Sequence, residues 1–136
     1  MTDSIALPQA LFRAMVDHAL AERPLEACGL VAGQGGRPVR FYPAVNAARS
    51  PVRYELAPDD LLRITMEIEA AGLELWGIFH SHPQTEAYPS HTDIRLALYP
   101  EAVYLIASLA DPDRPLLRAF SIDGPTVGEL SVAVTV

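Results

Sequence analysis

The stretch WGIFHSHPQTEAYPSHTDIRLAL, residues 76–98, decides how this chain folds and where its chemistry lies. The apolar run 75–79 predicts a buried strand, and two histidines, His80 and His82, follow it directly. Side chains two residues apart on a strand point to the same face, with Cα atoms about 6.6 Å apart. We therefore expect both imidazoles to reach a single metal ion.

A helix is predicted shortly after the two histidines. Pro83 cannot donate to a central strand ladder, so we expect the strand to stop there and residues 84–89 to form a short connection. Ser90 stands three residues before Asp93 and just ahead of an apolar run, which is the pattern of a helix N-cap. Asp93 then lies in the first helical turn, facing the strand end. Its carboxylate can supply a third ligand beside the two imidazoles.

Two imidazoles and one carboxylate form a ligand set suited to Zn²⁺, and three protein ligands leave one position open for water. A closed structural zinc site would use four ligands, usually with thiolates, which a chain with a single cysteine cannot supply. Taken singly, a histidine at a strand end is ordinary and S-x-x-D is often only a capping box. The full spacing H-x-H-x7-S-x2-D in a strand-loop-helix context favours a metal site with an open position.

The residues His80, His82, Ser90 and Asp93 in this setting resemble the JAMM signature of the MPN (Mov34/PAD-1) metalloproteases. A second block, P-x-E-x-C-G-L at residues 24–30, resembles the segment in which that family places an acidic residue at the start of a strand. The resemblance implies an α/β (α+β) fold, with a curved mixed sheet flanked by helices and an outline similar to cytidine deaminase. Deaminase chemistry itself is disfavoured, because its H-x-E and P-C-x-x-C signature is absent from the sequence.

The same resemblance implies hydrolysis of a peptide or isopeptide bond with a zinc cofactor. In the family, the residues matching His80, His82 and Asp93 hold the zinc ion. The residue matching Glu26 acts as general base, and the one matching Ser90 donates a hydrogen bond to the developing oxyanion. From sequence position alone, Glu26 would be a surface carboxylate in a helix-to-strand loop. Ser90 could serve as a helix cap, as an oxyanion donor, or as both.

The short chain looks like the stand-alone prokaryotic forms of the family, since it shows no obvious insertion. In those forms the partner is typically a ubiquitin-like sulfur-carrier protein with an extended C-terminal tail, and the product can be free cysteine. Two alternatives stay open. One is a non-catalytic MPN scaffold that binds a ubiquitin-like partner without metal, and the other is a zinc hydrolase of small amides.

Composition sets the remaining limits on what the protein does. At 136 residues, half hydrophobic and a fifth charged, we expect a single globular domain spanning 1–136. A net charge of −7 argues against nucleic acid and anionic membranes as partners. The N-terminus lacks the basic region of a signal peptide, and no stretch approaches the roughly 20 apolar residues that span a bilayer. With one cysteine, which suits a reducing compartment, the protein is expected to be cytoplasmic.

Three further residues could belong to a site. Cys28 with a histidine could form a nucleophilic pair, but a free cysteine within an apolar strand is usually a core residue, and we expect that here. His18 lies off the apolar stripe of its helix, so we interpret it as solvated. His91 could rotate toward the site as a substitute ligand, but the ligand pattern is complete without it, and we place it outside the metal shell.

The rest of the chain alternates strand and helix patterns. Loop 45–52, which carries Asn46, Arg49 and Ser50, either contacts a substrate chain or is a plain surface loop. One helix is expected from Pro8 to about residue 23 and another from Pro58 to a C-cap at Gly72. Strands are expected at residues 4–7, 27–32, 38–44, 53–56, 102–109, 116–122 and 127–134.

Overall fold

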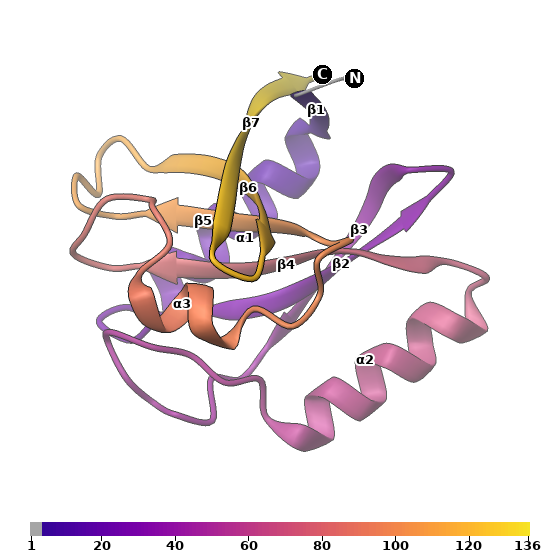
Figure 1. The fold of residues 1–136 in the computed structure, drawn as a ribbon, viewed down its shortest axis with the longest axis horizontal. Helices are drawn as coiled ribbons and strands as arrows, with labels where there is room; N and C mark the ends of the chain where they lie inside the picture. The colour runs from indigo at the N-terminus through magenta and orange to yellow at the C-terminus, as the bar shows by residue number, and fades with distance from the viewer. Residues whose placement is uncertain (1–3) are drawn as a thin grey trace.

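A seven-stranded sheet runs through the centre of the computed structural model, which describes residues 4–136 (Figure 1). The strands lie in the order β1-β7-β6-β5-β4-β2-β3. Along the chain the elements are β1 (Ser4–Pro8), α1 (Gln9–Glu22), β2 (Cys28–Gln34), β3 (Arg37–Ala44), α2 (Pro58–Ala70), β4 (Glu74–His82), α3 (His91–Leu96), β5 (Val103–Ser108), β6 (Leu116–Asp123) and β7 (Thr126–Thr135).

The sheet is mixed because two of its strand pairs are parallel. β1 pairs with β7 and β4 with β5 in parallel, whereas the other four pairs are antiparallel. The predicted fold, a mixed sheet flanked by helices, is confirmed. β4 lies between β2 and β5, so hydrogen bonds hold it along both edges. The strand that carries the two histidines is therefore fixed in the interior of the sheet.

Helices cover both faces of the sheet, and each face has its own apolar core. α1 buries its stripe of Leu11, Met15 and Ala19 in one cluster, and α2 and α3 pack on the cluster of the opposite face. On β4, Phe79 belongs to the α1 cluster and Ile78 to the other one. Because strand side chains alternate between faces, the histidines that follow at even positions lie on the face covered by α2 and α3.

The prediction of a strand at residues 53–56 is wrong. The segment makes only one isolated bridge, between Asn46 and Leu56. The Asn46 amide donates to the carbonyl oxygen of Arg53 and accepts from the amide N–H of Glu55. Since a side chain binds the main-chain groups that a ladder would need, the segment stays a loop. The other predicted elements are present, with ends displaced by a few residues.

The interpretation of His18 as a solvated residue is also wrong. Its ring is half-buried, with Nε2 lying 3.0 Å from the carbonyl oxygen of Cys28 and the ring centroid 5.9 Å from that of Phe41. His18 therefore ties α1 to the two strands beneath it. Periodicity could not reveal this, because the contact is made to a main-chain atom at the start of β2.

Gly29 allows β2 and β3 to approach closely. A Cβ at this position would lie 2.5 Å from the carbonyl oxygen of Tyr42 and 2.7 Å from the ring of Phe41. We expect Gly29→Ala to lower the free energy of unfolding by about 2 kcal/mol, because the β3 main chain must move. Urea unfolding followed by circular dichroism measures this. Gly128→Ala is the control, since its Cβ would meet only the flexible Ser121 hydroxyl at 3.0 Å. Equal losses in both variants would contradict the prediction.

Candidate active site

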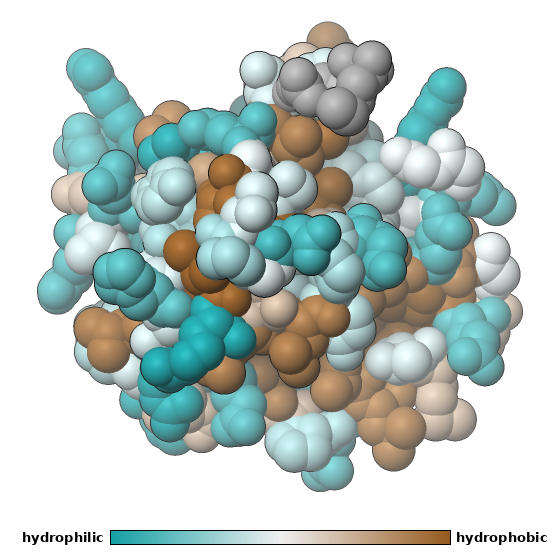
Figure 2. Space-filling view, viewed as in Figure 1, coloured by the Kyte–Doolittle hydropathy of each residue, from teal (hydrophilic) through white to brown (hydrophobic). Residues whose placement is uncertain are grey.

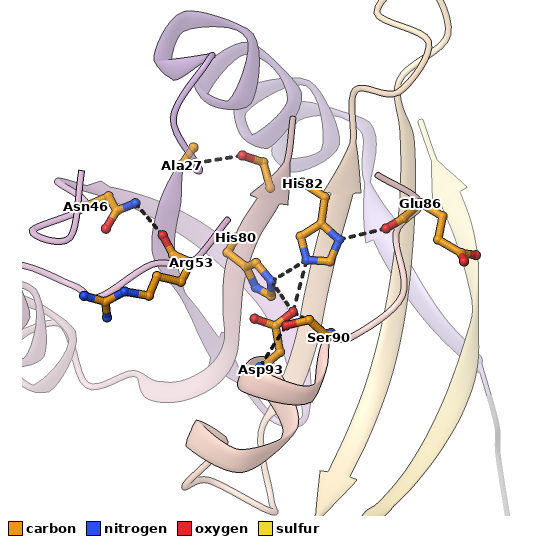
Figure 3. A network of polar contacts seen from close by, with 9 residues as sticks. Ala27, Asn46, Arg53, His80, His82, Glu86, Ser90 and Asp93 are labelled. Atoms are coloured by element: carbon orange, nitrogen blue, oxygen red, sulfur yellow. Dashed lines mark hydrogen bonds and ion pairs between the residues drawn. The ribbon is translucent and has the colours of Figure 1, made fainter. Parts of the chain in front are cut away.

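Two histidines at the end of β4 and an aspartate in the first turn of α3 form the centre of the site (Figure 3). The Nε2 atoms of His80 and His82 are 3.1 Å apart, and Oδ2 of Asp93 lies 3.1 Å and 3.0 Å from them. All three residues are buried. The predicted trio is therefore brought together, with three ligating atoms facing one point, as in a group that holds a metal ion.

A capping box places the Asp93 carboxylate. The Ser90 hydroxyl accepts from the Asp93 amide N–H at 3.0 Å, and the Ser90 amide N–H donates to Asp93 Oδ2 at 2.9 Å. The helix start predicted at Ser90 is thus present. Because Oδ2 is held by the Ser90 N–H and also faces both histidines, the sequence that begins the helix fixes the carboxylate in position.

The orientation of His82 is set by the loop that follows β4. Its Nδ1 lies 2.7 Å from the main-chain carbonyl oxygen of Glu86. A carbonyl oxygen only accepts, so Nδ1 carries the hydrogen and donates it. In the neutral ring the lone pair is then on Nε2, the atom that faces the other two groups. Sequence reasoning missed this contact, because a main-chain carbonyl carries no residue-type signal.

His80 is oriented differently, by packing against Tyr54. The two rings stack with centroids 4.4 Å apart and an interplanar angle of 18°. Nδ1 of His80 is buried without a hydrogen-bond partner in the described residues. The aromatic face of Tyr54 therefore takes the orienting role that a hydrogen bond plays for the other histidine. Tyr54 was also missed from sequence, since the segment that carries it was predicted as a strand.

The protonation states suit a cation. Burial would raise the pKa of Asp93, but hydrogen bonds with His80 and His82 hold it well below its usual range. Burial lowers the pKa of His80, so its ring is neutral. For His82, burial acts to lower the pKa, and hydrogen bonds to Asp93 and to the Glu86 carbonyl raise it overall. An anionic carboxylate is thus in place, and a metal ion would compete with a proton for Nε2 of His82.

The spacing of the donor atoms fits a small tetrahedral ion. Ligand atoms bound at about 2.0–2.1 Å in tetrahedral geometry lie about 3.3 Å from one another. The three atoms here are separated by 3.0 to 3.1 Å. An outward shift of about 0.2–0.3 Å would accommodate an ion of that coordination geometry. The residues present therefore fit a divalent metal ion.

Glu26 joins this group from the residues just before β2. β2 pairs antiparallel with β4, and the pairing continues past the start of β2 through the bond from Ser81 N–H to Ala27 O, 3.0 Å long. One residue further along this register, Glu26 lies opposite His82, and directly opposed residues share a face. Glu26 is only 2 % exposed. It is therefore not the surface carboxylate that its position in the sequence alone would indicate.

The carboxyl group of Glu26 is buried and has a raised pKa, as expected of a general base. Its Oε1 is buried without a hydrogen-bond partner in the described part of the chain. Burial raises its pKa to about 8, while the charge of His82 lowers it and that of Asp93 raises it further. The register that sets Glu26 opposite His82 puts its side chain on the same face of the sheet as the candidate metal site. A carboxyl with a pKa near neutrality is suited to general base catalysis.

The other candidate residues lie outside this group. His91 is exposed at the first position of α3, as expected. Cys28 is a core residue, also as expected, and burial raises the pKa of its thiol to about 12, which leaves little thiolate. In the loop after β3, Arg49 is exposed, but Asn46 is only 3 % exposed, so the surface-loop interpretation fails for Asn46.

Comparison with known proteins connects this geometry to a family. The family model described as prokaryotic homologs of the JAB domain matches residues 8–123. The chain belongs to this prokaryotic JAB family. The predicted JAMM/MPN resemblance is thereby confirmed.

Among relatives of this prokaryotic JAB protein, the CysO-cysteine peptidase of Mycobacterium tuberculosis is 44% identical over 126 residues, covering 91% of this chain and 86% of the relative. The desampylase of Haloferax volcanii is 41% identical over 121 residues, covering 87% and 84%. The solution structure of protein DSY2949 from Desulfitobacterium hafniense superposes with a TM-score of 0.87 at 36% identity, covering 96% of this chain and 92% of that one.

In residues 4–136, no helix is long and apolar enough to cross a membrane.

Glu26 predicts a pH dependence of stability in metal-free protein. Its carboxyl ionises near 4.5 in the unfolded chain and near 8 in the fold, so between these values the folded state keeps a proton that the unfolded state has released. Its contribution to stability is therefore complete below pH 4.5 and is lost as the pH rises through 8. Each unit between the two pKa values corresponds to about 1.4 kcal/mol.

We expect Glu26→Gln to raise the free energy of unfolding of the metal-free protein relative to the native chain. This gain should be about 3 kcal/mol larger at pH 8 than at pH 5. Urea unfolding in the presence of a chelator at both pH values measures the difference. The prediction fails if the two proteins lose stability in parallel between pH 5 and pH 8.

Proposed function

We propose that this protein is a zinc metallopeptidase that hydrolyses the peptide or isopeptide bond after the C-terminus of a ubiquitin-like or sulfur-carrier protein. One observation supports the proposal: His80, His82 and Asp93 bring three ligating atoms within 4.8 Å of one another, and the buried Glu26 follows on the strand register opposite His82. The substrate class is supported by the similarity to proteins named CysO-cysteine peptidase and desampylase.

His80, His82 and Asp93 would hold the zinc ion, which when bound polarises water and the scissile carbonyl. Glu26 removes a proton from the attacking water. Its burial serves this step, because a base with a pKa near the working pH is both available and strong enough. The same carboxyl, once protonated, delivers the proton to the leaving amine. Glu26 thus acts as base in the first half of the reaction and as acid in the second.

Ser90 has a hydrogen to spare for the reaction. Its hydroxyl oxygen accepts the Asp93 amide N–H, and the hydroxyl hydrogen has no acceptor among the described hydrogen bonds. Ser90 is half-buried beside Asp93. The hydroxyl can donate to the oxyanion that develops as the carbonyl is attacked while its oxygen continues to cap α3. The two roles proposed for Ser90 are therefore compatible.

An apolar channel beside the site offers room for an extended tail. A pocket of about 410 Å³ opens next to Asp93 and runs between α2 and the segment after α3. A second pocket of about 350 Å³ continues it and shares Leu30, Leu61 and Tyr99 with the first. Figure 2 shows hydrophobic residues gathered on this face over the region of α2 and α3. We propose that the C-terminal tail of the substrate protein lies in this channel.

The two alternative functions explain less of the site. A scaffold without metal would leave a buried carboxyl oxygen of Glu26 with no hydrogen-bond partner in the described part of the chain, which lowers stability without compensation. A hydrolase of small amides would need space only next to the ligand group. The channel extends well beyond it, into a second pocket that does not include Asp93.

The deciding experiment combines metal content with turnover of a ubiquitin-like protein fused at its C-terminus to cysteine or to a short peptide. We expect bound zinc and release of the fused group, detected by mass spectrometry. Glu26→Gln should lower kcat by roughly 10²–10⁴-fold with unchanged zinc content, because the base is lost and the ligands are kept. Zinc with activity only on small amides would support the small-amide hydrolase. Neither zinc nor turnover would support the scaffold.

Replacement of Ser90 separates its two roles. Ser90→Ala removes both the cap and the hydroxyl donor, so we expect a loss of about 1 kcal/mol in the free energy of unfolding and of roughly 10²-fold in kcat. Ser90→Thr keeps a hydroxyl that can perform both functions and should remain active. If Ser90→Ala lost stability alone, with kcat unchanged, the residue would be a helix cap and nothing more.

A further inference from the structure

Asn46 is a buried amide that the reaction scheme does not use. It lies in the loop between β3 and α2, with its side chain 3 % exposed. Its Nδ2 donates to the carbonyl oxygens of Glu26 and Arg53, both at 3.0 Å. Its Oδ1 accepts from the amide N–H groups of Ala48 at 2.9 Å and Glu55 at 3.0 Å. An asparagine amide offers two donor hydrogens and two acceptor lone pairs, and these contacts use all four.

The loop that contains Asn46 holds the main chain of Glu26 on both sides. The Glu26 amide N–H donates to the carbonyl oxygen of Ser50 at 2.9 Å, and the Glu26 carbonyl oxygen accepts from Asn46. β2 begins only at Cys28, so Glu26 lies outside the strand ladder. The loop therefore supplies for this residue the two main-chain hydrogen bonds that a neighbouring strand would otherwise provide.

The carboxyl group of Glu26 depends on this main-chain anchor. Its Oε1 has no hydrogen-bond partner in the described residues, so that oxygen is not held by a polar contact. The position of the carboxyl then follows from the position of its Cα and from the packing around it. A displaced main chain at Glu26 would carry the base away from the point that the three ligating atoms face.

The same amide also fixes the segment that covers His80. Arg53 and Glu55, which both bond to Asn46, stand on either side of Tyr54. Figure 3 shows Asn46 reaching the Arg53 carbonyl on the side of the site opposite Glu86. Tyr54 in turn stacks on the His80 ring. One side chain thus connects the base and the aromatic cover of a candidate ligand.

We propose that Asn46 is a positioning residue for the hydrolysis, which sets the carboxyl of Glu26 against the metal site through the Glu26 main chain. The inference rests on the proposed role of Glu26 as base. Asn46 touches no reacting atom. Its contribution is geometric, and a misplacement of about 1 Å in a catalytic group costs on the order of 10²-fold in rate.

The test compares Asn46→Ala with a control from the first turn of α2, which also bonds to this loop, at saturating zinc and with a ubiquitin-like protein fused to cysteine as substrate. Asp60→Ala is the control, because Asp60 Oδ2 accepts from the Val45 N–H at 2.8 Å and makes no hydrogen bond to Glu26. We expect kcat to fall roughly 10–100-fold for Asn46→Ala and to stay within about twofold for Asp60→Ala. Asn46→Ser is the milder variant if the alanine variant does not fold, since serine can still cap the loop turn but is too short to reach Glu26.

A double-mutant comparison asks whether Asn46 acts through Glu26. Glu26→Asp keeps a carboxyl base at reduced activity. If Asn46 positions the base, Asn46→Ala should cost clearly less on the Glu26→Asp background than on the native chain, because the geometry is already lost. Losses in kcat that multiply independently would overturn the proposal, as a merely structural role gives that result.

Hydrogen exchange at the Glu26 amide gives a readout that needs no activity. We expect exchange about tenfold or more faster in Asn46→Ala and unchanged in Asp60→Ala. Unchanged exchange in Asn46→Ala would overturn the proposal. If the native chain turned over no substrate at all, the proposed function would fail, while the exchange rates would still decide whether Asn46 fixes Glu26.

Discussion

The antiparallel pairing of β2 with β4 is the constraint on which the site depends. It sets Glu26, just before one strand, opposite His82 at the end of the other. A slip of one residue in this register would turn each side chain to the other face of the sheet. In the observed register Leu30 and Ile78 are buried on one face of the sheet and Val31 and Phe79 on the other. This register determines which groups meet at the site.

The buried titratable groups of the site lower the stability of the fold. His80, Glu26 and Asp93 are all buried, and one carboxyl oxygen of Glu26 has no hydrogen-bond partner within residues 4–136. Burying such groups away from water costs several kcal/mol in total unless they are paired. A divalent ion would offset part of this, since the carboxylate and both imidazoles are arranged around one point. The site lies at the ends of two interior strands, so the apolar cores on both faces of the sheet offset this unfavourable free energy.

Much of this arrangement could be predicted from sequence. The H-x-H spacing on a strand puts both rings on one face, and the Ser90 cap signal places Asp93 at the start of a helix. Both follow from local periodicity and local capping, which one chain segment encodes by itself. The parts that could not be predicted involve main-chain partners from distant segments. His82 is oriented by the Glu86 carbonyl, and His18 reaches the carbonyl of Cys28.

The loop between β3 and α2 shows why such contacts escape sequence analysis. Residues 53–56 have the composition of a strand, but Asn46 binds the main-chain groups that a strand partner would need. The buried Asn46 amide forms the main-chain hydrogen bonds that a neighbouring strand would otherwise form, and Tyr54 between the bonded residues stacks on His80. The candidate ligands thus lie at the end of β4 and in a capped helix, and Glu26 lies just before β2, whereas loops orient them and contribute to the lining of the adjoining pocket. The pocket is lined by Leu61 of α2, by Leu56 of the loop before it and by Leu98 after α3, and these residues belong to other segments than the strand that carries the histidines.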